Sequence, residues 1–235
     1  DSAYLSRTPG SAGNQTQFTL SVWVKRANTG GGGYETCIFS SAESSSNRGA
    51  IRFYGDELDA AYYNGAWVWE QRSTAVFRDP GAWYHIVVSL DTVNTSGKMY
   101  VNGEEITAFN TNTVPGSSLA TSFNNTVEHL VGARAPAATG YFDGELAEMY
   151  WIDGTIYDAD DFGETDSTTN QWKPIDASGL TFGTNGFYLK FQDSSDFGDD
   201  SSGEGNDWTA TNLVATDQMV DSPTNNFPTW NPLLY

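Results

Sequence analysis

GAWYHIVVSLDTVNTSGKMYVNGEEI, residues 81–106, decides the fold of this chain. Apolar side chains alternate with the others along its first half, which predicts a strand with one apolar face made of Tyr84, Ile86, Val88 and Leu90. Later in the stretch, Asn102 and Gly103 supply two residues that adopt positive φ at little cost, as a type I′ turn requires. The stretch therefore predicts a tight antiparallel hairpin.

The same two-residue period recurs along the chain, and helical periodicity is nearly absent. In residues 18–25, FTLSVWVK, one face carries Phe18, Leu20, Val22 and Val24. Further strands are expected at residues 37–40, 51–54, 58–63, 67–71, 127–132, 146–152 and 187–191, and one short helical turn at residues 158–162. Ten or more short strands separated by polar turns predict an all-β fold, a two-sheet antiparallel jelly-roll sandwich.

Composition narrows the classes of partner. The chain has 235 residues, with 11 Lys and Arg against 30 Asp and Glu, a formal net charge of −19. Such acidity disfavours nucleic acid and anionic membrane surfaces, which bind basic residues. No stretch approaches the ~18 apolar residues that cross a bilayer, so membrane insertion is not expected. Because Cys37 is the single cysteine, an internal disulfide is excluded. Cys37 is expected to be a small buried side chain.

Three segments resemble one family. FTLSVWVKRA resembles the early strand of laminin-G-like, concanavalin A-like jelly rolls, and residues 81–106 resemble their central strand and hairpin. YFDGELAEMYWIDGTIYDADDFGE resembles their late segment and the acidic turn that follows it. The resemblance covers roughly residues 3–165 and implies the sandwich fold. It implies no particular ligand, because function depends on sites that differ among members of a fold.

The order of segments departs from that family. A strand followed by a D-S-S-G-x-G-N loop usually opens the domain, whereas here residues 186–191 and the loop 200–206 follow the late segment. We therefore hypothesise a circular permutation, in which the usual first strand comes from the C-terminal side. The alternative is a second module that begins at Gly186. The permutation predicts one sandwich over residues 1–219, completed by a strand at residues 186–191.

The C-terminal stretch has a different composition. Residues 220–235 are rich in proline and asparagine, so an extended linker or strap is expected there rather than a central strand. Residues 221–233 resemble a segment that recurs in virion and tail-fibre proteins of marine phages. The chain also begins inside strand-like sequence, so we expect a fragment or a processed chain. These features together predict a phage virion surface protein that packs on other virion chains and forms a homo-oligomer.

Catalysis is not favoured by the sequence. The two histidines, His85 and His129, are isolated, and there is no G-x-S-x-G nucleophile elbow. In residues 143–148 the spacing of Glu145 and Glu148 puts them on opposite faces of a regular strand. Paired carboxylates for glycoside hydrolysis are therefore not expected, and the chain is predicted not to be an enzyme.

One loop concentrates oxygen ligands. Hard donors in the stretch DSSDFGDDSSGEGND favour a divalent cation of the calcium type, although the spacing is not that of an EF-hand. Related lectin domains often hold a calcium ion at the rim of the sandwich. The predicted structural Ca²⁺ ligands are Asp199, Asp200, Asn206 and Asp207. The competing interpretation is an acidic, solvated loop.

Aromatic residues indicate a glycan site. Sugars stack their C–H faces on aromatic rings, while amide, carboxylate and guanidinium groups bond their hydroxyls. In a regular strand Trp67 and Trp69 share one face, which is either an outward platform or part of the core. The predicted ligand-binding residues are Tyr34, Tyr63, Asn64, Trp67, Trp69 and Arg134.

Three functional interpretations follow from these features. The first is a non-catalytic adhesion module on a phage tail fibre or appendage, exposed at the virion surface, that binds a host surface glycan. The second is a structural or decoration protein of the virion. The third is a polysaccharide depolymerase.

Overall fold

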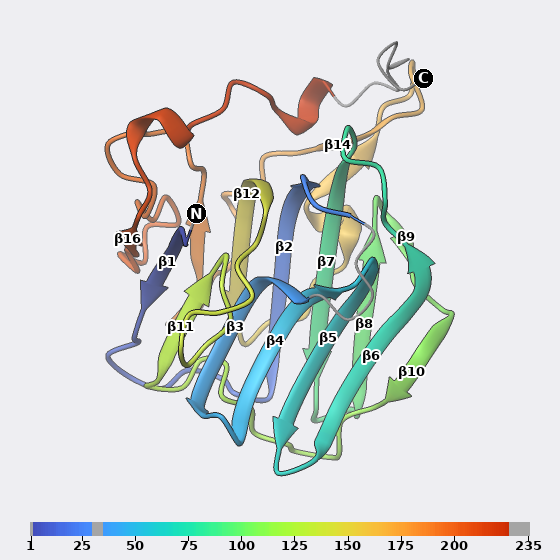
Figure 1. Ribbon diagram of the computed structural model, residues 1–235. Helices are drawn as coiled ribbons and strands as arrows, with labels where there is room; N and C mark the ends of the chain where they lie inside the picture. The colour runs from blue at the N-terminus through green and yellow to red at the C-terminus, as the bar shows by residue number, and fades with distance from the viewer. Residues whose placement is uncertain (1, 30–34, 226–235) are drawn as a thin grey trace.

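The computed structural model describes residues 2–29 and 35–225 and contains sixteen strands, three short 3-10 helices and no α-helix within those ranges. All strand pairs are antiparallel. The all-β, two-sheet prediction is therefore confirmed (Figure 1). Within the described ranges, no helical segment is long and apolar enough to cross a membrane.

The larger sheet has eight strands and forms one layer of the sandwich (Figure 1). The strands from β3 to β6 are consecutive in the chain, and each pairs with the next. Beyond β3, the sheet continues with strands that come from distant parts of the chain. In spatial order the strands are β10 (Phe109–Thr113), β6 (Trp67–Val76), β5 (Glu57–Asn64), β4 (Asn47–Tyr54), β3 (Glu35–Ser44), β11 (Glu128–Val131), β1 (Tyr4–Arg7) and β16 (Thr209–Thr211).

The smaller sheet has six strands and forms the second layer. Its order is β15 (Phe187–Leu189), β12 (Gly144–Asp153), β2 (Gln17–Arg26), β7 (Trp83–Asp91), β8 (Ser96–Val101) and β9 (Glu104–Glu105). The predicted hairpin is confirmed, because Val101 pairs with Glu104 and both Asn102 and Gly103 have positive φ. These two residues reverse the chain within two positions.

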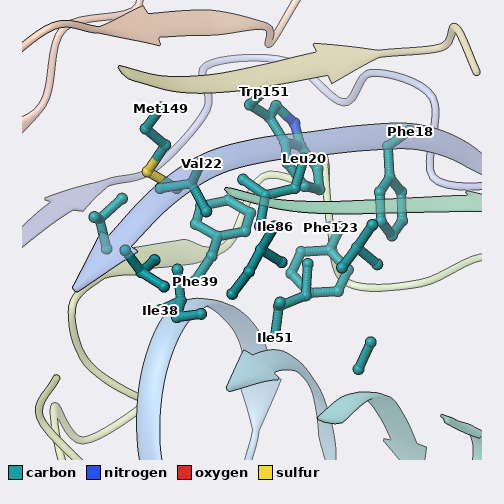
Figure 2. Packing of buried hydrophobic residues seen from close by; sticks show 14 of the residues in the cluster. Phe18, Leu20, Val22, Ile38, Phe39, Ile51, Ile86, Phe123, Met149 and Trp151 are labelled. Carbon is teal, nitrogen blue, oxygen red and sulfur yellow. The ribbon is translucent and has the colours of Figure 1, made fainter. Parts of the chain in front are cut away.

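The core lies between the two sheets, as Figure 2 shows for the central side chains. The apolar face predicted for residues 18–25 is confirmed, since Phe18, Leu20 and Val22 are fully buried in it. They pack against Phe39 and Ile51 from the larger sheet (Figure 2). Each such side chain contributes about 1.5–3 kcal/mol when it is fully buried.

A third layer covers the outward face of the smaller sheet. It consists of η1 (Ala159–Asp161), β13 (Gly163–Thr165), β14 (Trp172–Pro174) and their connecting loops. A second apolar cluster joins this cover to the sheet, with Phe162 and Phe182 packed against Tyr150 and Val87. The short helical turn predicted near residue 158 is confirmed and is capped by the side chain of Asp158. On the larger sheet, the loop at residues 133–141 packs over the outward side of β3, β11 and β1. Among the described residues, no comparable layer covers the outward side of β4, β5 and β6.

The C-terminal segment completes both sheets. Strand β15 pairs with β12 at one edge, and β16 pairs with β1 at the edge of the other sheet. Between these strands, Phe197 and Trp208 enter the main core. The segment continues through η2 (Ala215–Asp217) to η3 (Pro223–Asn225). The linker predicted at residues 220–235 lies mostly outside the described residues, and the circular permutation stays a hypothesis.

Candidate functional site

The outward face of the larger sheet gathers aromatic and charged side chains on β4, β5 and β6. Along β4 the core takes Ile51 and Phe53, so Arg52 and Tyr54 project outward by strand alternation. The same alternation on the neighbouring strands adds further outward groups. We call the resulting surface the arginine–aromatic face, made of Arg48, Arg52, Tyr54, Asp59, Tyr63, Trp67, Glu70 and Arg72.

Trp67 and Trp69 lie on opposite faces of the larger sheet. The prediction that Trp69 is a ligand-binding residue is therefore wrong. Tyr62 pairs with Trp69 and its neighbour Tyr63 with Trp67, so Val68 is an extra residue in β6. This β-bulge changes the alternation by one position. Trp69 is consequently 0% exposed, with its Nε1 donating to Gln71 at 3.0 Å, whereas Trp67 is 38% exposed. Trp69 belongs to the core, and Trp67 offers its ring at the surface.

The exposed rings lie against guanidinium groups. Tyr63 and Trp67 form an edge-to-face pair with centroids 5.1 Å apart. The Arg48 guanidinium carbon lies 4.8 Å from the Tyr63 centroid and 5.7 Å from that of Trp67. Arg52 approaches Trp67 to 5.4 Å from the other end of β4. These cation–π contacts fix the rings in place without covering them completely.

Ion pairs hold this face together from below. Asp59 is fully buried and accepts from Arg52 Nε at 2.7 Å and from Arg72 Nε at 3.2 Å. Arg52 also donates to Glu35 at 2.8 Å, and Arg72 pairs with Glu70. Buried charges are tolerated only when they are paired and hydrogen-bonded in this way. The network gives the outward aromatic rings a rigid support.

The other predicted ligand residues lie around this face. Asn64 is exposed at the turn between β5 and β6, next to Trp67 in the hairpin. Arg134 reaches the same charge network through Glu35, with its Nε 3.6 Å from that carboxylate. The prediction for Tyr34 lies outside the described residues. The structure thus brings Tyr63, Asn64 and Trp67 together and connects Arg134 to them.

Several residues of the face were not predicted from the sequence. Arg52, Tyr54, Asp59 and Arg72 were not singled out, although they recur at every second position of the hairpin at residues 47–64 and of the strand beside it. That period-two row of charged and aromatic residues was the available signal. From the sequence alone, such a row also fits a solvated surface. The strand register shows that the opposite charges are neighbours, because Asp59 pairs with Arg52 on one side and with Arg72 on the other.

The predicted calcium loop bonds to itself. The four acceptor positions of the Asp200 carboxylate are filled by backbone N–H groups of Tyr188, Ser202 and Asn206 and by the Ser202 hydroxyl, at 2.8–2.9 Å. Asp207 accepts from the Asp200 backbone at 3.0 Å and Asp199 from the Ser201 hydroxyl at 3.5 Å.

Asn206 is equally occupied. Its amide nitrogen donates to the carbonyls of Thr184 and Gly186, and its amide oxygen accepts from Arg7. Nowhere in the described ranges do three or more His, Cys, Asp or Glu side chains form a group that could hold a metal ion. The residues predicted as Ca²⁺ ligands therefore do not fit the ion in this arrangement, because their oxygens already order the loop.

Calcium is expected to leave the stability of the protein unchanged. A site that binds only the folded state would add about 2.7 kcal/mol at a hundredfold excess of ion over Kd. We expect the thermal midpoints in calcium and in EDTA, read by tryptophan fluorescence, to coincide. Asp200→Asn should lower both midpoints equally, since it weakens the carboxylate's bonds to the loop. A midpoint several degrees higher in calcium for the wild type alone would restore the loop as a metal site.

Glu145 and Glu148 lie on the same side of β12, which corrects the expectation from their spacing. Two residues, Glu148 and Met149, face the single residue Val22, so this strand also contains a bulge. Met149 fills the core position, and Glu148 projects outward with a φ of 48°. Glu145 also points outward, beside Lys25 at 3.9 Å.

Each of these carboxylates has its own partner. Glu148 Oε2 accepts from the hydroxyls of Tyr188 and Tyr150, whose rings stack 4.0 Å apart. Lys25 bridges Glu145 and Asp221. Burial raises the pKa of Glu145, and the Lys25 charge opposes that rise. Glu148 is thus held by two tyrosine hydroxyls and Glu145 by the ammonium group of Lys25.

Both histidines are buried and neutral. His85 Nδ1 accepts from the Trp172 indole at 3.0 Å, so Nε2 carries the proton and donates to Ser21 at 2.8 Å. His129 Nε2 accepts from the Asn124 backbone at 3.1 Å, and its Nδ1 donates to the Val127 carbonyl. Burial lowers the pKa of His85 to about 3 and that of His129 to about 4. Neither ring reaches the arginine–aromatic face.

A cavity of about 1190 Å³ lies at one end of the sandwich under the segment 216–223. Carboxylates such as Glu145 and Asp221 line it together with apolar side chains such as Phe142 and Met219. Of the predicted ligand residues that the structure describes, only Arg134 contributes to its wall. The arginine–aromatic face, which gathers more of them on regular strands, is the stronger candidate site.

Comparison with known proteins supports the fold. The profile of a family described as the concanavalin A-like lectin/glucanases superfamily, Laminin_G_3, matches residues 1–160. No curated protein matches the chain by sequence.

Several solved structures are similar to this chain. A candidate carbohydrate-binding protein from Bacteroides ovatus has a TM-score of 0.60 and 13% identity, over 89% of this chain and 56% of that one. Domain 4 of a Geobacillus stearothermophilus arabinanase in complex with arabinotriose has a TM-score of 0.47 and 19% identity, over 61% and 64%. Domains LG4-5 of the mouse laminin α1 chain have a TM-score of 0.44 and 11% identity, over 66% and 42%. This chain thus spans less than two thirds of each of these structures.

Proposed function

The chain belongs to the Laminin_G_3 family of the concanavalin A-like lectin/glucanases superfamily, and from that premise we propose that it is a non-catalytic, extracellular glycan-binding module. The site of binding is the arginine–aromatic face. Solved structures of the same fold include a candidate carbohydrate-binding protein, which supports this assignment.

One observation carries the proposal, the exposed ring of Trp67 beside Tyr63 on the outward face of the larger sheet. A tryptophan of a stable sandwich is normally buried, as Trp69 is two residues away. An exposed aromatic ring supplies a flat apolar surface for the C–H face of a sugar, and nearby polar groups bond its hydroxyls. Asn64 and the surrounding arginines provide such groups.

Trp67→Ala is expected to abolish glycan binding with the fold retained. A nucleic-acid base stacked on an aromatic side chain contributes on the order of 1–3 kcal/mol. A loss of that order would remove most of the affinity of a weak sugar site. Binding to an array of bacterial surface polysaccharides and oligosaccharides measures this, and Trp67→Phe should keep part of it.

Val93→Ala is the matched control for that experiment, because it truncates an exposed apolar side chain in the turn between β7 and β8. It should bind as the wild type does. If the wild type binds no glycan on a diverse array, or if Trp67→Ala binds normally, the proposed function is wrong.

We extend the proposal to a place on a phage particle, as an adhesion module of a tail fibre or appendage. The resemblance of residues 221–233 to a virion segment supports it. Many copies on one particle would turn a shallow, weak sugar site into firm attachment through avidity. Mass spectrometry of purified particles tests this, and absence of the chain from them would refute it.

A structural role in the virion is the second candidate, because one surface favours contact with other chains. The C-terminal segment exposes Val214, Met219 and Val220 within seven residues. Exposed apolar side chains gathered in this way mark surfaces that other proteins cover. Replacement of all three by serine should then impair assembly of the particle and leave glycan binding intact.

A further inference from the structure

Positive charge is concentrated on the face proposed to bind glycans. The chain has only 11 Lys and Arg residues against 30 Asp and Glu. Four of the eleven, Arg48, Arg52, Arg72 and Arg134, lie on the arginine–aromatic face or in direct contact with its charge network. In a chain this acidic, solubility alone does not explain such a concentration of positive charge on one face of the larger sheet.

Three of these arginines are engaged with carboxylates. Arg52 is paired with both Asp59 and Glu35, and Arg72 with Asp59 and Glu70. Arg134 has a longer contact with Glu35, at 3.6 Å, and donates to the Thr139 hydroxyl at 3.1 Å. These three arginines therefore have a structural role, because each is paired with a carboxylate of the protein itself.

Arg48 differs from them. Within the described part of the chain it forms no ion pair, and its hydrogen bond goes to the backbone carbonyl of Ser45. A guanidinium has five N–H donors in a planar fork, so most of them stay available to a ligand. Burial lowers the pKa of Arg48, and the positive charges of Arg134 and Arg52 lower it further. Its surroundings therefore favour the approach of an anion.

We propose that the ligand of this site is an anionic glycan, whose carboxylate or sulfate group binds Arg48 while the sugar ring stacks on Trp67. This inference rests on the proposed function and specifies its substrate class. Arg48 lies over the Tyr63 ring, 4.8 Å from its centroid, and within 6 Å of that of Trp67. The stacked ring and the anion would therefore contact adjacent groups of one site.

The chemistry of guanidinium supports an anionic partner. Arginine matches the planar geometry of carboxylate and related oxyanions through two parallel hydrogen bonds. Charge-assisted bonds of this kind are stronger than those to neutral hydroxyls. The net charge of −19 opposes anions at long range. At about 0.15 M salt that repulsion is screened beyond roughly 8 Å, while a direct contact with Arg48 persists.

The test compares oligosaccharides that differ only in charge. Tetragalacturonic acid and its methyl ester form one pair, and a sulfated carrageenan tetrasaccharide and its desulfated form make the second. Titration calorimetry at 0.15 M salt should give at least a tenfold lower Kd for the charged member of one pair. The two pairs distinguish a carboxylate from a sulfate as the bound group.

Arg48→Gln should abolish this preference. We expect its Kd for the charged probe to rise at least tenfold, to the value of the neutral probe, with an unchanged thermal midpoint. Lys98→Gln removes the same charge from an exposed side chain on the smaller sheet and serves as the matched control. Its binding should equal that of the wild type.

The failures of the two proposals are distinguishable. If neutral probes bind through Trp67 and Arg48→Gln changes no affinity, the anionic ligand is wrong and the glycan site stands. If no member of either pair binds, the anionic ligand is also overturned, and the array with Trp67→Ala decides the proposed function separately. If Arg48→Gln weakens the binding of charged and neutral probes by the same factor, anion recognition by Arg48 is likewise contradicted.

Discussion

A chain that ends at residue 185 is expected not to fold. The missing segment carries β15 and β16, which close the edges of β12 and β1. It also carries four side chains of the main core, Phe187, Leu189, Phe197 and Trp208. Truncation of one large core side chain costs about 2–5 kcal/mol. Four such losses exceed about 8 kcal/mol, in a domain whose total stability is about 5–15 kcal/mol.

Urea unfolding followed by near-ultraviolet circular dichroism measures this expectation. The shortened chain should give no cooperative transition, and the full chain a single one. A chain ending at residue 219 is the control, because it keeps both strands and the core side chains, and removes the ion pair of Asp221 with Lys25 and the packing of η3 on β14. An exposed pair of this kind contributes little. If the chain ending at residue 185 unfolds cooperatively, the permutation hypothesis is wrong and residue 186 begins a separate module.

Acidification is expected to destabilise the protein through its two histidines. In the unfolded chain each histidine titrates near pH 6.5, whereas burial lowers the pKa of His85 to about 3 and of His129 to about 4. Between pH 6.5 and 4.5 the unfolded state therefore binds protons that the folded state excludes. The free energy of unfolding falls by about 1.4 kcal/mol per pH unit for each histidine. The two together remove about 5 kcal/mol by pH 4.5.

The sign of the effect follows from the lowered pKa values. The contribution is complete above pH 6.5 and is lost as the pH falls toward the folded-state pKa values. Urea midpoints and m-values at several pH values give the slope of stability with pH. Because acid also relieves repulsion among the chain's carboxylates, the slope is best compared between variants.

His85→Gln and His129→Gln should each flatten that slope. The glutamine amide cannot take up a proton. Each variant should therefore lose up to about 1.4 kcal/mol per pH unit from the slope of the free energy of unfolding with pH, whatever its stability at neutral pH. Lys98→Gln should keep the wild-type slope. Equal slopes in the wild type and in both histidine variants would show that the rings are not excluded from protonation.

Local patterns predicted the regular parts of this fold. The alternation at residues 18–25 and the Asn102-Gly103 turn were sufficient to place strands and a hairpin, because each depends only on neighbours in sequence. Short strands such as β1 and β16 were not predicted. Three or four residues carry too little periodicity to be recognised, and their pairing depends on strands far away in the chain.

The candidate site was predictable only in part, and the bulges explain why. A period-two argument assumes that no residue is inserted, so it placed Trp69 with Trp67 and separated Glu145 from Glu148. One extra residue in each strand reversed both conclusions. The bonds inside the acidic loop were not predictable for another reason, since composition cannot show that a carboxylate such as Asp200 accepts bonds from backbone N–H groups.

The cover on the smaller sheet makes the molecule one-sided. Residues 155–182 cover that face with a second apolar cluster, and the loop at residues 133–141 covers β3, β11 and β1 of the larger sheet. Among the described residues, the outward side of β4, β5 and β6 is therefore the open sheet surface, and it is approached from one direction. A partner that binds the covered side of the smaller sheet leaves the arginine–aromatic face free. A partner that binds the outward face of the larger sheet blocks the arginine–aromatic face. The orientation in which the domain is mounted would therefore act as a switch between an adhesive and an inert copy of the same chain.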